Sequence, residues 1–224
     1  WDSVIYKDIV KRHRIRSVQG IEDLGRYLLS NLTSEYASRT LSAVTRCRSV
    51  HTVEKYLRHL EEAFLLFPLT RFSFKVKEQA RANRKVYCID NGFATAKGFQ
   101  FSPNVGKLCE NLVAVALKRL ELAGRAEIYF WKNPQQEEVD FVVKQGADVT
   151  QLIQVCWNLE APQTKTREVR ALLKASRELR CQDLLILTES TEAEDTAEWF
   201  GMKGRVRYVP LRKWLLGHSA PAAA

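Results

Sequence analysis

Glu138-Val139-Asp140-Phe141-Val142-Val143, followed by Gln154-Val155-Cys156-Trp157, is the part of the sequence that decides the fold of this chain. In both segments, polar residues stand two positions apart within an apolar run. Residues two apart on a β-strand point to the same face of the sheet. Glu138 is therefore predicted to lie beside Asp140, and Gln154 beside Cys156 on the neighbouring strand. The pattern predicts two adjacent strands, each with a polar pair on one face.

The residues around these two strands predict a sheet covered by helices. Residues 106–122 carry apolar side chains at helical spacing, and Glu110 lies within the otherwise apolar first half of that helix. The order of elements predicts an α/β fold with a mixed sheet and helices on its faces. In chain order the predicted elements are a helix over 106–122, strands over 127–132, 138–144 and 151–157, a helix over 164–179, strands over 183–188 and 206–210, and a helical turn over 212–216.

The first half of the chain has a different pattern, which predicts mainly helices. Helical spacing of apolar residues is found over 2–15, 18–30 and 41–44, and in a longer segment that begins after Ser49. The apolar stripe of that longer helix consists of Val50, Val53, Leu57 and Leu60. The stripe leaves the following residues facing outward: Ser49, His51, Thr52, Lys55, Arg58 and His59.

A basic hairpin is predicted after these helices. Residues 71–77 alternate strictly between polar and apolar side chains, which is typical of a half-buried strand, and residues 85–90 are its expected partner. A short helix, a turn, an amphipathic helix and a basic hairpin follow one another in a winged helix. We therefore predict a helical winged-helix domain over residues 1–98, the α/β domain over 99–217 and a disordered tail over 218–224.

A winged helix suggests where DNA would bind. The second helix of its turn presents N-terminal polar residues to the major groove, and the wing contacts phosphates. The predicted groove contacts are Ser49, His51, Thr52 and Lys55, and the predicted backbone contacts are Lys75, Lys77, Arg81 and Arg84. The alternative is a winged helix that docks protein and whose basic residues are simply solvated.

The charge of the chain is unevenly distributed. Residues 1–100 hold 18 Lys and Arg against 10 Asp and Glu, whereas residues 101–224 hold 17 against 16. A basic excess confined to one half favours a polyanion as partner, and double-stranded DNA is the partner we expect. The other interpretation is that the excess only keeps the protein in solution.

The cysteines indicate a reducing, cytoplasmic compartment. Five widely spaced cysteines without a C-x-x-C pair argue against a disulfide framework, and the four histidines share no zinc-ligand spacing. The apolar runs are too short to cross a bilayer, so no membrane partner is expected.

The polar residues of the second half suggest metal chemistry that is incomplete. Phosphodiester hydrolysis needs oxygen ligands for a hard cation such as Mg²⁺ or Mn²⁺, together with a positive group near the reacting water. Asp140 and Glu110 are the candidate metal ligands, whereas Gln154 offers only a neutral oxygen and Cys156 a soft thiol. Lys132 or Lys144 would have to replace the missing positive group. Otherwise Glu110 and Asp140 are a residual polar pair, and no cofactor is expected.

Several segments together resemble the C-terminal region of archaeal and bacterial AAA-type ATPases. In those proteins a winged helix and a restriction-endonuclease-like domain of the PD-(D/E)XK superfamily follow the nucleotide-binding module. The resemblance runs from about residue 4 to residue 216. The segments that carry it are Val86-Tyr-Cys-Ile-Asp-Asn-Gly-Phe93, the Glu110-Asn-Leu-Val helix, Tyr129-Phe-Trp-Lys132, Glu138-Val-Asp-Phe141, Gln154-Val-Cys156 and Thr166-Arg-Glu168.

The resemblance implies a nuclease-like fold whose chemistry is altered. The last motif of the family resembles Glu-Val-Lys, and here Gln154-Val-Cys156 stands in its place. Glu110, Asp140 and Gln154 would then form a degenerate catalytic site. The resemblance also implies an ATPase domain upstream of Trp1, with that domain and sister subunits as partners. Gly106-Lys107 is followed by Leu108 rather than Ser or Thr, so this chain has no P-loop of its own.

Three functions from different classes follow from the sequence. The first is a DNA-binding and assembly module of an ATPase, without catalysis of its own. The second is a metal-dependent DNA nuclease. The third is a protein-docking platform.

Overall fold

The computed structural model describes residues 1–47, 49–99, 104–159 and 161–219, and these residues form two compact units. The first unit comprises residues 1–69 and 82–107, and the second comprises residues 70–81 and 108–224. The mixed α/β class predicted from the sequence is confirmed. Among the helices of the described residues, none is both long enough and apolar enough to cross a membrane.

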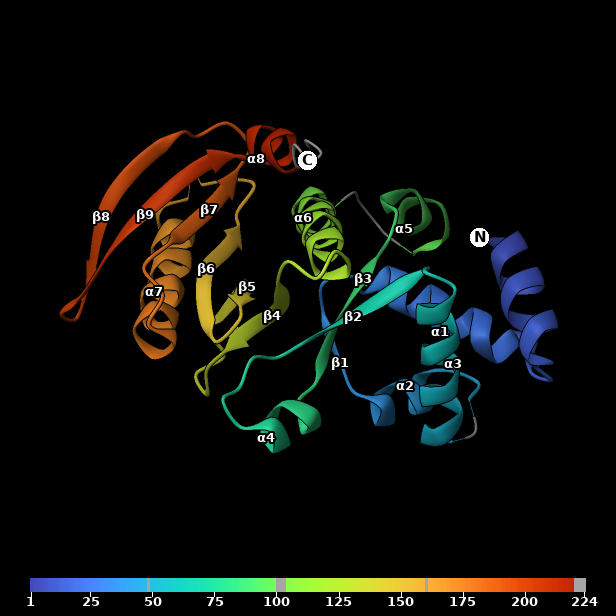
Figure 1. The fold of residues 1–224 in the computed structure, drawn as a ribbon. Helices are drawn as coiled ribbons and strands as arrows, with labels where there is room; N and C mark the ends of the chain where they lie inside the picture. The colour runs from blue at the N-terminus through green and yellow to red at the C-terminus, as the bar shows by residue number, and fades with distance from the viewer. Residues whose placement is uncertain (48, 100–103, 160, 220–224) are drawn as a thin grey trace. The chain divides into compact units, whose positions relative to one another are not determined.

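The first unit consists of helices and a small three-stranded sheet (Figure 1). The strands run in the order β1-β3-β2, and β1 pairs antiparallel with β3. In chain order the elements are η1 (Val4–Lys11), α1 (Val18–Ser30), β1 (Glu35–Tyr36), α2 (Ser38–Val44), α3 (Val50–Glu62), β2 (Leu66–Thr70), β3 (Arg84–Cys88) and α5 (Asn91–Lys97).

The predicted helices of this unit are confirmed with small changes in their bounds. The segment predicted over 2–15 contains a π-helical turn, η1, whose Ile5 and Ile9 are fully buried. Helix α3 begins at its cap Ser49, whose hydroxyl accepts a hydrogen bond from the Thr52 amide at 3.1 Å. Two side chains were assigned to the wrong face of α3: His59, expected to face outward, is only 7% exposed, and Val50, expected in the buried stripe, is 37% exposed.

The strand predicted over residues 71–77 is wrong. Only Arg71 forms a β-bridge, and residues Val76–Arg81 form the short helix α4. Ser73 gives the physical reason, because its hydroxyl accepts a hydrogen bond from the Lys75 amide at 3.1 Å and turns the chain there. The same hydroxyl donates to Glu78 at 3.0 Å, in the first turn of α4.

Burial shows why the alternating pattern failed. Phe74 and Val76, expected to face the core, are 71% and 78% exposed. The strand lies earlier, at β2, where the run Leu66-Phe-Pro-Leu-Thr70 is mostly buried. Its expected partner strand is confirmed as β3. The chain therefore forms its strand from the continuous apolar run of β2 and not from the alternating residues 71–77, because the continuous run buries more apolar area.

The second unit contains a mixed sheet, as predicted, but with six strands instead of the five expected (Figure 1). Its strand order is β4-β5-β6-β7-β9-β8, with parallel pairs β6·β7 and β7·β9 between antiparallel pairs. Helix α7 connects the parallel strands β6 and β7 and packs on the sheet. The elements are α6 (Val105–Leu122), β4 (Glu127–Lys132), β5 (Glu138–Gln145), β6 (Asp148–Val155), α7 (Pro162–Leu179), β7 (Leu184–Thr188), β8 (Ala193–Trp199), β9 (Met202–Pro210) and α8 (Leu211–Ser219).

The core of this unit lies between the sheet and α7. Leu172 and Leu173 on the helix pack with Leu152, Leu184 and Val206 on the strands, and all five are at most 1% exposed. The segment Thr70–Arg81 belongs to this unit as well. Its Phe72 amide donates to the Phe130 carbonyl at 2.7 Å. Helix α8 continues to Ser219, and the remainder of the predicted tail lies outside the described residues.

Candidate functional site

The predicted nuclease-like residues line one cavity of the second unit, with a volume of about 590 Å³. Glu110 reaches it from α6, Asp140 from β5 and Gln154 from β6. The structure therefore brings together the three residues that the sequence selected. It adds side chains that the sequence analysis did not assign to a site, namely Glu137, Glu138, Arg167, Glu168 and Arg170.

A continuous chain of hydrogen bonds crosses this cavity. The Val155 amide donates to Asp140 Oδ2 at 2.9 Å, and the Asp140 amide donates to Gln154 Oε1 at 3.2 Å. Gln154 Nε2 then donates to Glu168 Oε2 at 2.7 Å, and Arg167 Nη2 donates to Glu168 Oε1 at 2.5 Å. Gln154 thus uses both ends of its amide to connect β5 to α7. A glutamate in its place would lack the donor that faces Glu168.

Glu168 has a sequence signal that could have revealed it. It precedes Leu172 by four residues, so it shares the buried face of α7, and it is 7% exposed. A carboxylate on the buried face of a helix needs partners, because an unpaired buried charge is costly. Gln154 and Arg167 are those partners.

Among the residues that the structure describes, no three His, Cys or carboxylate ligand atoms at this cavity lie within 4.8 Å of one another. Within the described ranges, the single group of three His, Cys or carboxylate side chains with ligand atoms inside 4.8 Å of one another lies in the first unit. That group consists of His13, His59 and Glu62. At the cavity, Asp140 and Glu168 already accept hydrogen bonds from an amide and a guanidinium. Each carboxylate oxygen keeps a further lone pair, so these hydrogen bonds alone do not prevent a cation from binding.

Cys156 takes no part in the cavity lining that the structure describes. Its thiol donates to the Asn158 carbonyl at 3.3 Å, and the residue packs in the hydrophobic core of the second unit. Burial raises the pKa of this thiol to about 11, and the nearby Glu168 charge acts in the same direction. The thiol is therefore protonated at neutral pH, so Cys156 supplies neither a nucleophile nor a positive charge.

The cations of the cavity come from α7 rather than from the expected lysines. Lys144 pairs with Glu127, and Lys132 lies 3.8 Å from Glu138. Arg170 and Lys174 instead both bind Glu137, at 2.6 and 2.7 Å. Burial alone would raise the pKa of Glu137, but hydrogen bonds from Lys174 and Asn133 and the charge of Arg170 outweigh burial and lower it. Glu137 is thus a firmly held anion.

The predicted DNA contacts fall into separate groups. Ser49, His51, Thr52 and Lys55 lie together on the first two turns of α3, next to the helix α2 that packs against it. Lys75, Lys77 and Arg81 lie in or beside α4 and belong to the second unit, whereas Arg84 begins β3 in the first. Lys75 forms an ion pair with Glu78 at 2.8 Å.

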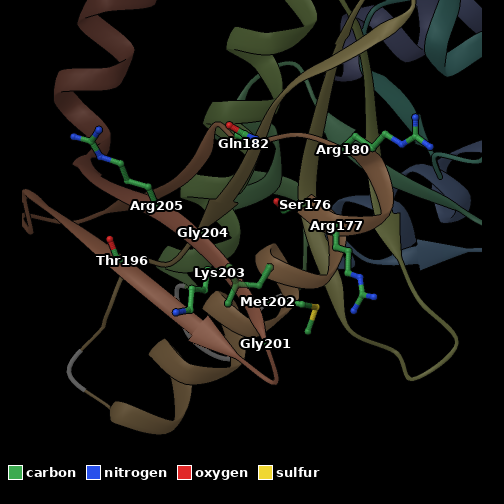
Figure 2. A pocket seen from close by; sticks show the side chains of 11 residues that line it. Ser176, Arg177, Arg180, Gln182, Thr196, Gly201, Met202, Lys203, Gly204 and Arg205 are labelled. Atoms are coloured by element: carbon green, nitrogen blue, oxygen red, sulfur yellow. The ribbon is translucent and has the colours of Figure 1, made fainter.

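A second cavity of the same unit, with a volume of about 940 Å³, is basic (Figure 2). It lies between the end of α7 and strand β9, and four cations line it without a carboxylate among its lining residues. Figure 2 shows Arg177 and Arg180 on one side of this cavity and Lys203 and Arg205 on the other.

Comparisons with known proteins match both halves of the chain. Residues 1–102 match the family model Domain of unknown function (DUF8612), and residues 105–214 match Domain of unknown function (DUF4143). An uncharacterized protein of Methanocaldococcus jannaschii is 29% identical over 221 residues, which cover 96% of this chain and 48% of that protein. An uncharacterized protein of Haemophilus influenzae is 25% identical over 163 residues, which cover 71% of this chain and 39% of that protein. The chain thus spans about half or less of these relatives.

One solved assembly contains a chain whose structure is weakly similar to that of this chain. It is described as a half-complex of Thermococcus gammatolerans McrB AAA+ hexamers with bound McrC. The sequence identity is 14% and the TM-score 0.35, over 86% of this chain and 47% of the other. A TM-score this low does not establish a shared fold. By sequence the chain is similar, along nearly its whole length, to two families described as domains of unknown function, DUF8612 in its first half and DUF4143 in its second.

Proposed function

We propose that this chain is a DNA-binding and assembly module whose nuclease-like cavity is not catalytic. The observation that carries the proposal is the packed helix pair α2 and α3, in which α3 begins at a capped, exposed and polar first turn. His51 in that turn and Lys55 in the next are both exposed. In helix-turn-helix proteins the second helix enters the major groove with its N-terminal residues.

The arrangement of the first unit supports a winged helix. Helices α2 and α3 follow the short strand β1, and β2 and β3 complete a three-stranded sheet. A helix pair beside such a sheet is the framework of that fold. The segment between β2 and β3 groups with the second unit, so Lys75, Lys77 and Arg81 are weaker candidates for phosphate contact than the α3 residues.

The bonding of Gln154 supports a silent cavity. A nuclease needs carboxylate oxygens that are open to a cation and a positive group near the reacting water. Here Gln154 offers one neutral oxygen, which already accepts the Asp140 amide, and the position of the expected lysine carries a buried neutral thiol. The side chains serve the packing of α7 on the sheet instead.

We propose that an ATPase domain lies in the part of the larger protein that this chain does not cover. The chain covers 48% and 39% of the two curated relatives, so each relative has a further part of comparable length. From the family resemblance of the sequence we infer that this further part holds a nucleotide-binding module. We therefore propose that the chain works beside an ATPase domain and sister subunits in the cytoplasm. All five cysteines are free and buried, which agrees with a reducing compartment.

Binding of a labelled DNA duplex, followed by fluorescence anisotropy at two salt concentrations, tests the proposal. We expect the Kd to rise with salt, because phosphate contacts release counterions. Lys55→Ala should weaken binding by about 3- to 10-fold and lower the salt slope by about one.

Lys11→Ala is the matched control, since Lys11 is an exposed lysine of the same unit on η1. Its Kd should match that of the unaltered chain. Absence of duplex binding at about 50 mM salt would contradict the proposal and leave protein docking as the function of α3.

A metal-dependent nuclease is the second candidate, because five carboxylates line the cavity. A cleavage assay with Mn²⁺ and an Asp140→Asn control decides between the two. Cleavage that Asp140→Asn abolishes would show that the cavity is catalytic.

A further inference from the structure

The tip of the β8–β9 hairpin carries a residue that its turn does not favour. Trp199 pairs with Met202, so Phe200 and Gly201 form a two-residue loop. Their φ angles are 46° and 74°, both in the left-handed region. Hairpin loops with positive φ at both positions favour Asn-Gly or Gly-Gly, and a bulky side chain is strained there. The turn therefore gives no reason for a phenylalanine.

Packing within the chain gives no reason either. Phe200 is 85% exposed, the largest exposed fraction among the large hydrophobic residues that the structure describes. Its ring meets Trp199 edge-on, with 5.1 Å between the ring centroids. Trp199 is itself held by the Arg170 guanidinium, 5.4 Å from its ring. The hairpin tip thus exposes the Phe200 ring to solvent, and Trp199 and Arg170 pack beneath it.

The basic cavity described above begins at this tip, since Gly201 is one of its lining residues (Figure 2). Arg177 and Arg180 have no carboxylate partner among the described residues. Lys203 and Arg205 pair with Glu198 and Glu194 of the same hairpin, and both cations are at least two-thirds exposed. Exposed ion pairs contribute little, so these cations can exchange their partners for phosphate.

We propose that the β8–β9 hairpin and the end of α7 bind single-stranded nucleic acid. The four cations would contact consecutive phosphates, and Phe200 would stack on an unpaired base. Bases inside a duplex are already stacked and paired, so a lone exposed aromatic ring beside cations fits a single strand. The surface lies on the second unit, and the proposal is independent of duplex binding by α3 in the first.

Anisotropy of the full chain with a fluorescein-labelled oligothymidylate tests this proposal. Phe200→Asn should raise the Kd about 10-fold, the loss expected for one stacked base. The same change should leave the Tm unchanged or raise it, because asparagine suits the turn. A loss of binding would then not be a loss of folding. Arg177→Glu with Arg180→Glu should also raise the Kd and flatten its salt dependence.

Phe64→Asn is the matched control, because Phe64 is 65% exposed, has a φ of 53° and lies in the first unit. The Kd of Phe64→Asn for oligothymidylate should not change. The Kd of Lys55→Ala, the variant that tests duplex binding, should not change either. The proposal is overturned if Phe200→Asn binds like the unaltered chain, or if Phe64→Asn binds as weakly as Phe200→Asn. It is also overturned if the chain binds vesicles of phosphatidylcholine and phosphatidylglycerol but not the oligonucleotide.

Discussion

At the residue scale, Gln154 connects a strand to a helix across the cavity. The Gln154 amide donates to Glu168 while accepting from the Asp140 backbone. Both functions need an amide, since a carboxylate has no hydrogen to donate. The hydrogen bond between Gln154 and Glu168 needs one amide and one carboxylate. We therefore expect that the two side chains can be swapped together but that neither can be replaced by the other alone.

Exchange of these two residues is the first prediction at this scale. Gln154→Glu removes the donor and places two buried carboxylates together, which should lower the free energy of unfolding by about 1–3 kcal/mol. Adding Glu168→Gln restores one donor and one acceptor and should recover most of the loss. Urea denaturation measures both. A Gln154→Glu protein as stable as the unaltered chain would show that this bond does not support the fold.

Thiol reactivity is the second prediction. Burial raises the pKa of Cys88, Cys109 and Cys156 to about 11 in each case. At pH 8 only about one in a thousand of these thiols is a thiolate, and the thiolate is the reactive form. Iodoacetamide should label all three in guanidinium and none in the native protein, as measured by mass spectrometry of peptides. Fast native labelling of Cys156 would contradict a buried, neutral thiol.

At the scale of elements, regular apolar periodicity predicted most helices and the central strands. Strand β8 was missed because its sequence, Ala-Glu-Asp-Thr-Ala-Glu-Trp, carries only one large apolar residue and is mostly exposed. It forms only because β9 offers it a full antiparallel ladder from Ala193 to Trp199. Strand β9 in turn approaches α7 closely, and Gly204 is the residue that permits this approach.

Gly204→Ala tests that approach. An added Cβ would lie 2.7 Å from Leu173 and 2.9 Å from Leu184. Both leucines are about 1% exposed and cannot move into solvent, so we expect a loss of about 1–3 kcal/mol from overpacking. Gly106→Ala is the control within helix α6, where the new methyl group meets only Asn104 at 3.5 Å and should stabilise the helix by up to about 1 kcal/mol. Thermal denaturation compares the two variants.

At the scale of the whole molecule, folding decides the ionisation of His59. Its ring stacks on His13 with 3.7 Å between centroids, and its Nε2 has no hydrogen-bond partner among the described residues. Burial lowers the pKa of His59, although the Glu62 carboxylate opposes this effect. The folded protein therefore favours the neutral imidazole more than the unfolded chain does.

Acid sensitivity follows from this ionisation. Below the ordinary histidine pKa of about 6.5 the unfolded chain takes up a proton before the folded one, so the stability falls as the pH drops. Urea denaturation should give a lower free energy of unfolding at pH 5.5 than at pH 7.5, and His59→Gln should reduce that difference. His51→Gln, at an exposed position of the same helix, should leave it intact. An equal response of both variants would contradict a specific role for His59.

The sequence by itself determined the mixed α/β class, the order of most elements and the shared face of Glu138 and Asp140, whereas Glu110, Asp140 and Gln154 were grouped by the family resemblance. It could do so because strand and helix periodicity fix which side chains share a face. Only the tertiary structure decided that residues 71–77 are not a strand, that His59 is buried and that Glu168 and Arg167 complete the cavity. These outcomes depend on which surfaces meet after folding, and local spacing does not specify contacts between residues far apart in the chain.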